Sequence, residues 1–280
     1  MRINFIQNLI DKIRNKPNFT KQLVYKIEGY NKAENVSRII LGSSHLANGY
    51  YAVEGEYNLA MPSQDLYTAY ELYKRLNRPD IKQVIIAISA FTPGLSTIKT
   101  ISADFCVSYK CLLGIDYQYE EDAKEKNLYS KEVSCCQEIA EYKNNLTIGS
   151  DTHGNLLRYP HRNFNNKKLK ERALKHFKNN QREISQLPYC EKILEIAKSN
   201  NQKVFFVIPP VTKSYVNAIP NKDILFIKLK EIVEKWDNAE IFNFFEAEGF
   251  DEKTDFTDED HLNKNGAVKF ANLVRGLVNN

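Results

Sequence analysis

Short apolar runs rich in β-branched and aromatic residues recur along the chain, separated by segments with helical periodicity. We expect strands at 38–42, 57–60, 84–89, 203–208 and 241–245. Each run is short and mostly apolar on both faces, as in a parallel sheet that is covered on both sides. Amphipathic helices are expected at 65–76, 189–197, 224–236 and 265–278. This alternation predicts an α/β sandwich whose strands are joined by right-handed crossovers.

The stretch 95–185 interrupts this alternation. It is polar and rich in Lys, Asn and Tyr, and it is far too long for a connecting loop. We therefore expect a single domain over 1–280 that carries a helical insertion at 95–185, placed as a cap over the active edge of the sheet. The tyrosines of the insertion suit stacking on sugar rings. They include Tyr109, Tyr117, Tyr119, Tyr129, Tyr142 and Tyr159.

The net charge bears on which partners the protein can have, and the cysteine content bears on the cellular compartment in which it works. The chain has 39 basic and 35 acidic residues, a net charge of +4, which is too small and dispersed to indicate a nucleic-acid partner. Its five cysteines form no C-x-x-C pair, which favours free thiols in a reducing cytoplasm. The N-terminus lacks the apolar core of a signal peptide, and no apolar run is long enough to span a membrane. We therefore expect a cytoplasmic protein without an integral membrane segment.

A short apolar stripe near the N-terminus has basic residues beside it. It comprises Phe5, Leu9, Ile10 and Ile13. We expect this stripe to pack on the domain itself, and contact with a membrane surface is the alternative.

Gly42-Ser43-Ser44 directly follows the first expected strand. Open parallel sheets bind their ligands at this carboxyl edge. A tight turn here can raise a hydroxyl into the cleft and begin a helix, whose N-terminal N–H groups face a developing oxyanion. The alternative is that the serines only cap the helix.

A second polar motif, Asp258-x-x-His261, precedes the last expected helix. An Asp three residues before a His can bring its carboxylate to the imidazole Nδ1, which supports a His that takes a proton from serine. By itself the acidic cluster could equally cap a helix or, with Asp260, bind a divalent ion. No second ligand cluster is evident, and we expect neither a metal nor another cofactor.

Together the two motifs resemble those of the SGNH (GDSL-like) hydrolase superfamily over 36–94 and 200–280. The Gly-Ser-Ser form resembles the branch of bacterial polysaccharide O-acetylation and teichoic-acid D-alanylation proteins. The resemblance implies a flavodoxin-like three-layer sandwich with a parallel sheet. It also implies a catalytic Ser-Asp-His set: Ser44 as nucleophile, His261 as base and Asp258 as its partner.

The middle motifs of the family match less closely. Ser63 falls where the family has an oxyanion-hole glycine, so the backbone N–H groups of Ser44 and Ser63 are the expected oxyanion donors. The family also has an Asn after the third strand, but the sequence here is Ser89-Ala90-Phe91-Thr92. A lost oxyanion donor typically costs a factor of about 10² to 10³ in rate. The residues expected on the substrate side are Ser43, His45, Asn58, Gln64 and Phe91.

The resemblance implies a serine-dependent acyl ester hydrolase or O-acyltransferase. The expected substrate is a small-molecule or carbohydrate ester, with O-acetylated bacterial carbohydrate favoured by the branch that the motifs resemble. The alternative is a catalytically inactive SGNH-like protein that binds a glycan or a partner, which the missing Asn favours. The motifs do not distinguish hydrolysis from transfer, and they leave the oligomeric state open.

Overall fold

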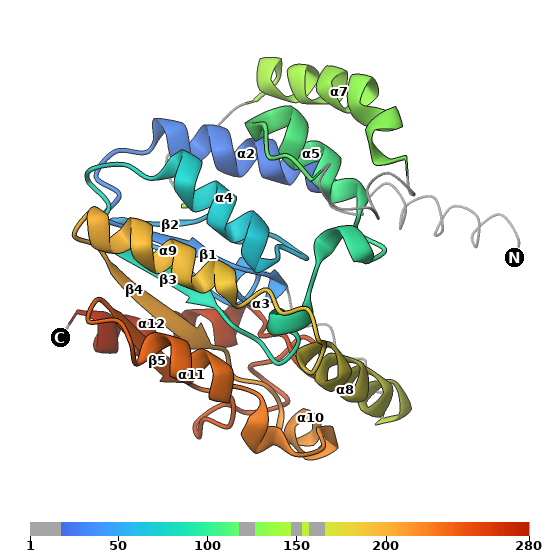
Figure 1. The fold of residues 1–280 in the computed structure, drawn as a ribbon, viewed down its shortest axis with the longest axis vertical. Helices are drawn as coiled ribbons and strands as arrows, with labels where there is room; N and C mark the ends of the chain where they lie inside the picture. The colour runs from blue at the N-terminus through green and yellow to red at the C-terminus, as the bar shows by residue number, and fades with distance from the viewer. Residues whose placement is uncertain (1–17, 118–126, 147–152, 157–165, 280) are drawn as a thin grey trace, which may run out of the picture.

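A single parallel sheet organises the protein. The computed structural model describes residues 18–117, 127–146, 153–156 and 166–279, so the N-terminal apolar stripe lies outside the described residues. The strands are β1 (Arg38–Leu41), β2 (Glu56–Asn58), β3 (Gln83–Ala87), β4 (Lys203–Ile208) and β5 (Ala239–Asn243). They lie in the order β2-β1-β3-β4-β5 (Figure 1). This is the flavodoxin-like order, in which the chain changes direction between β1 and β3.

The central strands bury side chains on both faces of the sheet. Ile39 and Leu41 of β1 belong to one apolar cluster, whereas Ile40 belongs to a second. Successive residues of a strand point to opposite faces, so the two clusters are the two sides of the sheet. This explains why the strands read as continuous apolar runs.

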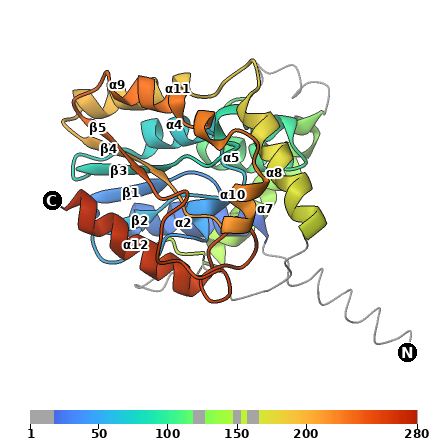
Figure 2. The ribbon, with the colours of Figure 1, turned by 90° about the horizontal axis from the view of Figure 1, so that it is seen from below.

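Helices cover both faces and make three layers. On one side lie α2 (Phe19–Lys32), α4 (Leu66–Leu76), α9 (Pro188–Ser199) and α11 (Ile227–Val233). On the other side lie α12 (Lys264–Val278) and the short α3 (Ser44–Ala47). Figure 2 shows the strands between α12 and the pair α9 and α11. The three-layer α/β sandwich predicted from the sequence is confirmed.

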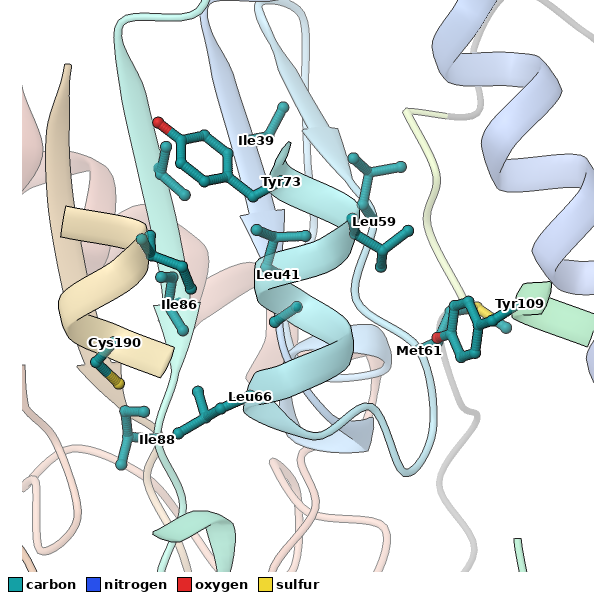
Figure 3. Packing of buried hydrophobic residues seen from close by; sticks show 14 of the residues in the cluster. Ile39, Leu41, Leu59, Met61, Leu66, Tyr73, Ile86, Ile88, Tyr109 and Cys190 are labelled. Atoms are coloured by element: carbon teal, nitrogen blue, oxygen red, sulfur yellow. The ribbon is translucent and has the colours of Figure 1, made fainter. Parts of the chain in front are cut away.

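The larger apolar layer is built from helix residues that lie over the strands. Leu66 and Tyr73 of α4 belong to the same cluster as Leu41 and Ile86 of the sheet (Figure 3). All four side chains are almost fully buried, and burying each apolar side chain contributes about 1.5–3 kcal/mol. The Tyr73 hydroxyl donates to Gln202 just before β4, which satisfies the one polar atom of that ring.

The expected strands and helices agree with the structure except at the last strand and the helix before it. β5 begins two residues earlier than expected and is only partly buried, whereas β2 at the other edge of the sheet is buried at every position. The helix expected at 224–236 divides into a 3-10 turn (Lys222–Ile224) and α11.

The helices between β3 and β4 pack on different parts of the domain. Its elements are the 3-10 turns η1 (Thr92–Gly94), η2 (Thr97–Lys99) and η3 (Leu128–Lys131), and the helices α5 (Asp104–Leu113), α7 (Glu132–Asn144), α8 (Asn166–Asn180) and α9. α5 and α7 pack on α2, whereas α8 packs on α10 (Lys213–Ala218) and η1 (Figure 1). Among the described residues, α8 therefore lies beside the elements that follow β3 and β4, and the His153 carbonyl reaches the end of β2, where it accepts from the Asn58 N–H.

Two of the tyrosines expected on a substrate surface are core residues instead. Tyr109 and Tyr117 are fully buried, where their hydroxyls bond Gln64 and Thr68. Tyr119 and Tyr159 lie outside the described residues. The predicted tyrosine surface is therefore wrong at Tyr109 and Tyr117, because the insertion needs its own apolar contacts to pack on the domain.

The free thiols predicted from the sequence are confirmed. All five cysteines are free. No helix among the described residues combines the length and the apolar character that crossing a membrane requires.

Candidate active site

The turn after β1 places Ser44 at the carboxyl edge of the sheet. Gly42 has a φ of 128° and lies so close to β3 that an added Cβ would be 2.6 Å from the Cβ of Ala87. The turn leads directly into α3, with Ser43 at the N-cap and Ser44 as the first helical residue. The Ser43 hydroxyl does not cap the helix. Ser44 thus lies at the switch point between β1 and β3, where sheets of this topology bind ligands.

A tight loop before α12 brings Asp258 and His261 to the same edge. Phe256 and Leu262 form an antiparallel bridge across the loop, and the Thr257 N–H donates to the His261 carbonyl at 2.8 Å. Asn263 then caps α12 by accepting from two backbone N–H groups. The loop is therefore anchored at both ends, and its tip carries the two polar side chains.

The structure brings Ser44, His261 and Asp258 into one hydrogen-bonded chain. Ser44 Oγ lies 2.8 Å from His261 Nε2, and His261 Nδ1 lies 2.8 Å from Asp258 Oδ1. The same carboxylate oxygen accepts from the His261 backbone N–H at 2.9 Å. His261 is buried whereas Ser44 is partly exposed, so a reagent can reach the hydroxyl. This is the geometry of an activated serine nucleophile.

Charged neighbours favour the protonated form of His261. Burial lowers its pKa, but the Asp260 carboxylate and the hydrogen bond to Asp258 outweigh burial and raise the pKa to about 9. Burial raises the pKa of Asp258, and its hydrogen bond to His261 outweighs this and brings the pKa below its usual value. His261 therefore carries a proton at neutral pH, and it must lose that proton before it can act as a base.

Two backbone N–H groups face no protein acceptor near the nucleophile. Ser63 has a φ of 58°, the left-handed conformation that favours glycine, as expected for a residue at the family's glycine position. Ser44 is at the first position of a helix, where N–H groups have no intrahelical acceptor. Within the described residues, neither N–H donates to a protein group. The role of these two N–H groups as oxyanion donors stays a prediction.

Four of the five residues expected on the substrate side are buried. Asn58 donates to the carbonyls of Leu46 and Tyr50 and accepts from the Ala60 N–H. Gln64 accepts from the Gly42 N–H and donates to the Leu59 carbonyl. The substrate contact predicted for Asn58 and Gln64 is therefore wrong. Their polar groups hold the segment after β1 and the loop after β2 together.

Ser43 and His45 lie behind the hydrogen-bonded chain rather than beside a substrate. Both are buried, and Ser43 Oγ lies 3.3 Å from His45 Nδ1. The His45 ring stacks on His261 with centroids 4.5 Å apart. Their predicted substrate contact is also wrong, because α3 turns both side chains into the protein. Phe91 alone of the five is partly exposed, and its substrate contact stays a prediction.

The sequence reasoning missed two residues of α8. Arg172 Nε lies 2.9 Å from Asp260 Oδ1, and His176 Nδ1 lies 2.6 Å from the Tyr215 hydroxyl. The stretch 167–178 reads as a basic, solvated helix face. Their helical spacing could have indicated them, because Arg172 and His176 lie four residues apart on one face of the helix. The same face carries Leu169 and Ala173, which are buried against the domain.

Asp260 is a second carboxylate beside His261. Its side chain is fully buried, and Oδ1 lies 3.3 Å from His261 Nδ1. Burial raises its pKa, but the charges of the neighbouring His261 and Arg172 outweigh burial and hold the pKa well below its usual value. Asp260 is therefore ionised in a site with almost no access to water.

Among the described residues, one group of side chains could hold a metal ion. Donor atoms of His45, Asp260 and His261 all lie within 4.8 Å of one another. Both ring nitrogens of His261 are already engaged, by Ser44 and Asp258. A cation bound there would have to displace one of these partners, so the donor set fits the serine site better than a metal site.

Comparisons with known proteins give only distant structural likenesses. No family model matches the sequence, and no curated protein matches it. One solved structure, provisionally described as a platelet activating factor from Streptococcus pneumonia, is 12% identical over 98% of each chain, with a TM-score of 0.49. Another, provisionally described as an acylhydrolase from Bacteroides fragilis, is 9% identical over 94% of this chain and 98% of its own, with a TM-score of 0.44. Similarity at this level does not assign a function to the chain.

Proposed function

We propose that the protein is a serine-dependent acyl ester hydrolase or O-acyltransferase. The observation that carries the proposal is the chain of two 2.8 Å contacts from Ser44 through His261 to Asp258. The placement of Ser44 at the switch point of the sheet, with partial exposure, supports it as well.

In the first half of the proposed reaction, Ser44 takes the acyl group from an ester. His261 Nε2 accepts the hydroxyl proton while Ser44 Oγ forms a bond to the acyl carbon. The Ser44 and Ser63 N–H groups bind the resulting oxyanion. The bond from the acyl carbon to the alcohol oxygen then breaks, and His261 returns the proton to that oxygen. An acyl ester of Ser44 remains.

The second half releases the acyl group. Water, or the hydroxyl of an acceptor, gives a proton to His261 as its oxygen bonds to the acyl carbon. The bond to Ser44 Oγ breaks, and His261 returns the proton to Ser44. With water the product is a free acid, and with an acceptor hydroxyl it is a new ester. Hydrolysis and transfer therefore use the same protein residues and differ only in whether water or an acceptor hydroxyl takes the acyl group.

We favour O-acetylated bacterial carbohydrate as the substrate class. The support is the resemblance of the Gly42-Ser43-Ser44 and Asp258-x-x-His261 motifs to those of polysaccharide O-acetylation proteins. The partly exposed Phe91 ring is the aromatic surface beside the site that could stack on a sugar.

Labelling with a fluorophosphonate probe tests the proposal. Such probes react with activated serines, so we expect one adduct that peptide mapping places on Ser44. Ser44→Ala should lose the adduct and lower turnover of an aryl acetate by more than about a thousandfold. Ser199→Ala, an exposed serine at the end of α9, is the control and should label as the wild type does. Full turnover by purified Ser44→Ala would refute the assignment.

Binding without turnover is the second candidate function. Phe91 follows the third strand where the resembled family has an Asn, so a side-chain oxyanion donor is missing at that position. A protein of this kind would bind an O-acetylated glycan but would leave Ser44 unlabelled. Slow or absent labelling together with glycan binding would favour this candidate.

A further inference from the structure

Asp260 is buried as an ion without the hydrogen bonds that usually accompany one. Its side chain is fully buried, and neither carboxylate oxygen receives an aligned hydrogen bond from the described residues. A buried carboxylate without hydrogen bonds is costly unless positive charge lies beside it. The groups around Asp260 must therefore include a cation.

Two neighbours can supply that positive charge. Arg172 Nε lies 2.9 Å from Asp260 Oδ1, and His261 Nδ1 lies 3.3 Å from the same oxygen. The other neighbours are neutral imidazoles, because burial lowers the pKa of His45 and lowers that of His176 to about 3. Arg172 and His261 thus share one buried negative charge.

His261 consequently has two carboxylates at one ring nitrogen. Asp258 Oδ1 lies 2.8 Å from Nδ1 and accepts its hydrogen bond, while Asp260 adds negative charge from the other side. Arg172 opposes this, since its Nη2 lies 3.4 Å from the same Nδ1. The charged and titratable groups that face His261 or Asp260 come from their own loop, α3, α8 and α10. They are Asp258, Asp260, His45, Arg172, His176 and Tyr215.

We propose that Asp260 is a second, positioning carboxylate for His261, because its negative charge strengthens the hold of the imidazole on its proton. Arg172 of α8 weakens this effect, because it pairs with the same carboxylate. The inference rests on the proposed function, in which His261 carries the proton of Ser44. Asp260 stabilises the imidazolium that forms when Ser44 is acylated. Contact between α8 and the catalytic loop thereby adjusts how strongly the base holds its proton.

Two substitutions with opposite expected effects test this. Asp260→Asn removes the negative charge at nearly constant volume, and we expect the midpoint of the His261 titration to fall by about one pH unit or more. Arg172→Met removes the opposing positive charge, and we expect the midpoint to rise. Lys175→Met is the matched control, because Lys175 is exposed on the same helix and its loss should leave the midpoint unchanged.

The readout is an NMR titration of the imidazole of His261, assigned by its loss in His261→Gln. The same variants are then scored by the pH dependence of fluorophosphonate labelling, whose acid limb should move with the NMR midpoint. Shifts of the same sign in the two variants, or no shift in either, would overturn the proposal. If Asp260→Asn fails to fold, an unchanged or lowered midpoint in Arg172→Met is sufficient to overturn it.

The test separates this inference from the proposed function. If Ser44 is never labelled but the midpoints move in opposite directions, the proposed function fails and the charge arrangement stands. If Ser44 is labelled normally and the midpoints do not move, Asp260 has no such role. The double variant Asp258→Asn/Asp260→Asn adds a further check: it should lose more labelling than the two single variants predict together, because each carboxylate partly replaces the other.

Discussion

Replacing Gly42 with alanine should destabilise the protein and displace the nucleophile. The added Cβ would lie 2.6 Å from the Cβ of Ala87 and 3.1 Å from its backbone nitrogen, whereas carbon atoms pack best at about 3.5–4.0 Å. Overpacking a tight site costs about 1–3 kcal/mol. A positive φ of 128° in a residue with a Cβ costs about 1–3 kcal/mol more. We therefore expect the free energy of unfolding to fall by about 2–6 kcal/mol.

Substitutions at two other glycines separate the cost of the contact with Ala87 from the cost of the positive φ. Gly114 has a φ of 68° but nothing within 4 Å of an added Cβ, and Gly276 lies inside α12 with open space around it. Gly114→Ala should lower the free energy of unfolding by about 1–2 kcal/mol, from the backbone alone. Gly276→Ala should raise it by about 0.5–1 kcal/mol, because alanine favours the helix.

Equilibrium unfolding in urea measures all three variants, and fluorophosphonate labelling reports on the position of Ser44. Gly42→Ala should be the least stable of the three and should label poorly even in the folded state, because the turn must move away from β3. If it is as stable as Gly114→Ala, the contact with Ala87 has no energetic effect. If it matches the wild type, the close approach of β1 and β3 is not what shapes the turn.

Three further predictions concern the site and the core. The rate of Ser44 labelling should rise with pH through about 9, because the raised pKa of His261 keeps the base protonated below that value; a flat profile between about pH 6 and pH 10 would contradict this. Glu56→Gln should lower the free energy of unfolding, measured in urea, by about 3–5 kcal/mol. The reason is that the buried Glu56 carboxylate accepts from both Arg38 and Arg275. A loss below about 1 kcal/mol would show that these ion pairs do not stabilise the fold as buried pairs. Thorough chelation should leave aryl acetate turnover unchanged, with elemental analysis of the treated protein as the check, and a loss restored by a divalent metal would reassign His45, Asp260 and His261 as ligands.

The elements of the sandwich could be predicted because their signal is local. Strands such as 84–89 and 203–208 are apolar on both faces, and short runs of this kind are typical of parallel strands covered by helices on both sides. The exception is β5, whose position at the edge of the sheet depends on which strands pair. Its bounds depend on its pairing with β4, and its partial burial is not shared by β2 at the other edge of the sheet.

The candidate catalytic residues could also be predicted, since each lies in a short motif at a strand or helix end. Ser44 and His261 are 217 residues apart in sequence, and only the carboxyl edge of a parallel sheet brings such motifs together. The residues expected beside the substrate were mostly wrong for the same reason. Position in a motif does not tell whether a side chain is partly exposed, as at Phe91, or buried in the protein, as at Asn58.

The sequence by itself determines the parallel sandwich and the pairing of a serine with an Asp-x-x-His motif, because periodicity and short motifs are encoded by neighbouring residues. Only the tertiary structure places Arg172 beside Asp260 and His261, which are neighbours in sequence. Arg172 is 89 residues from His261 in sequence, and its role depends on where α8 packs. The charge on the base is thus decided by burial and by a contact of 2.9 Å between α8 and the loop before α12, because electrostatic effects grow strong only where water is excluded.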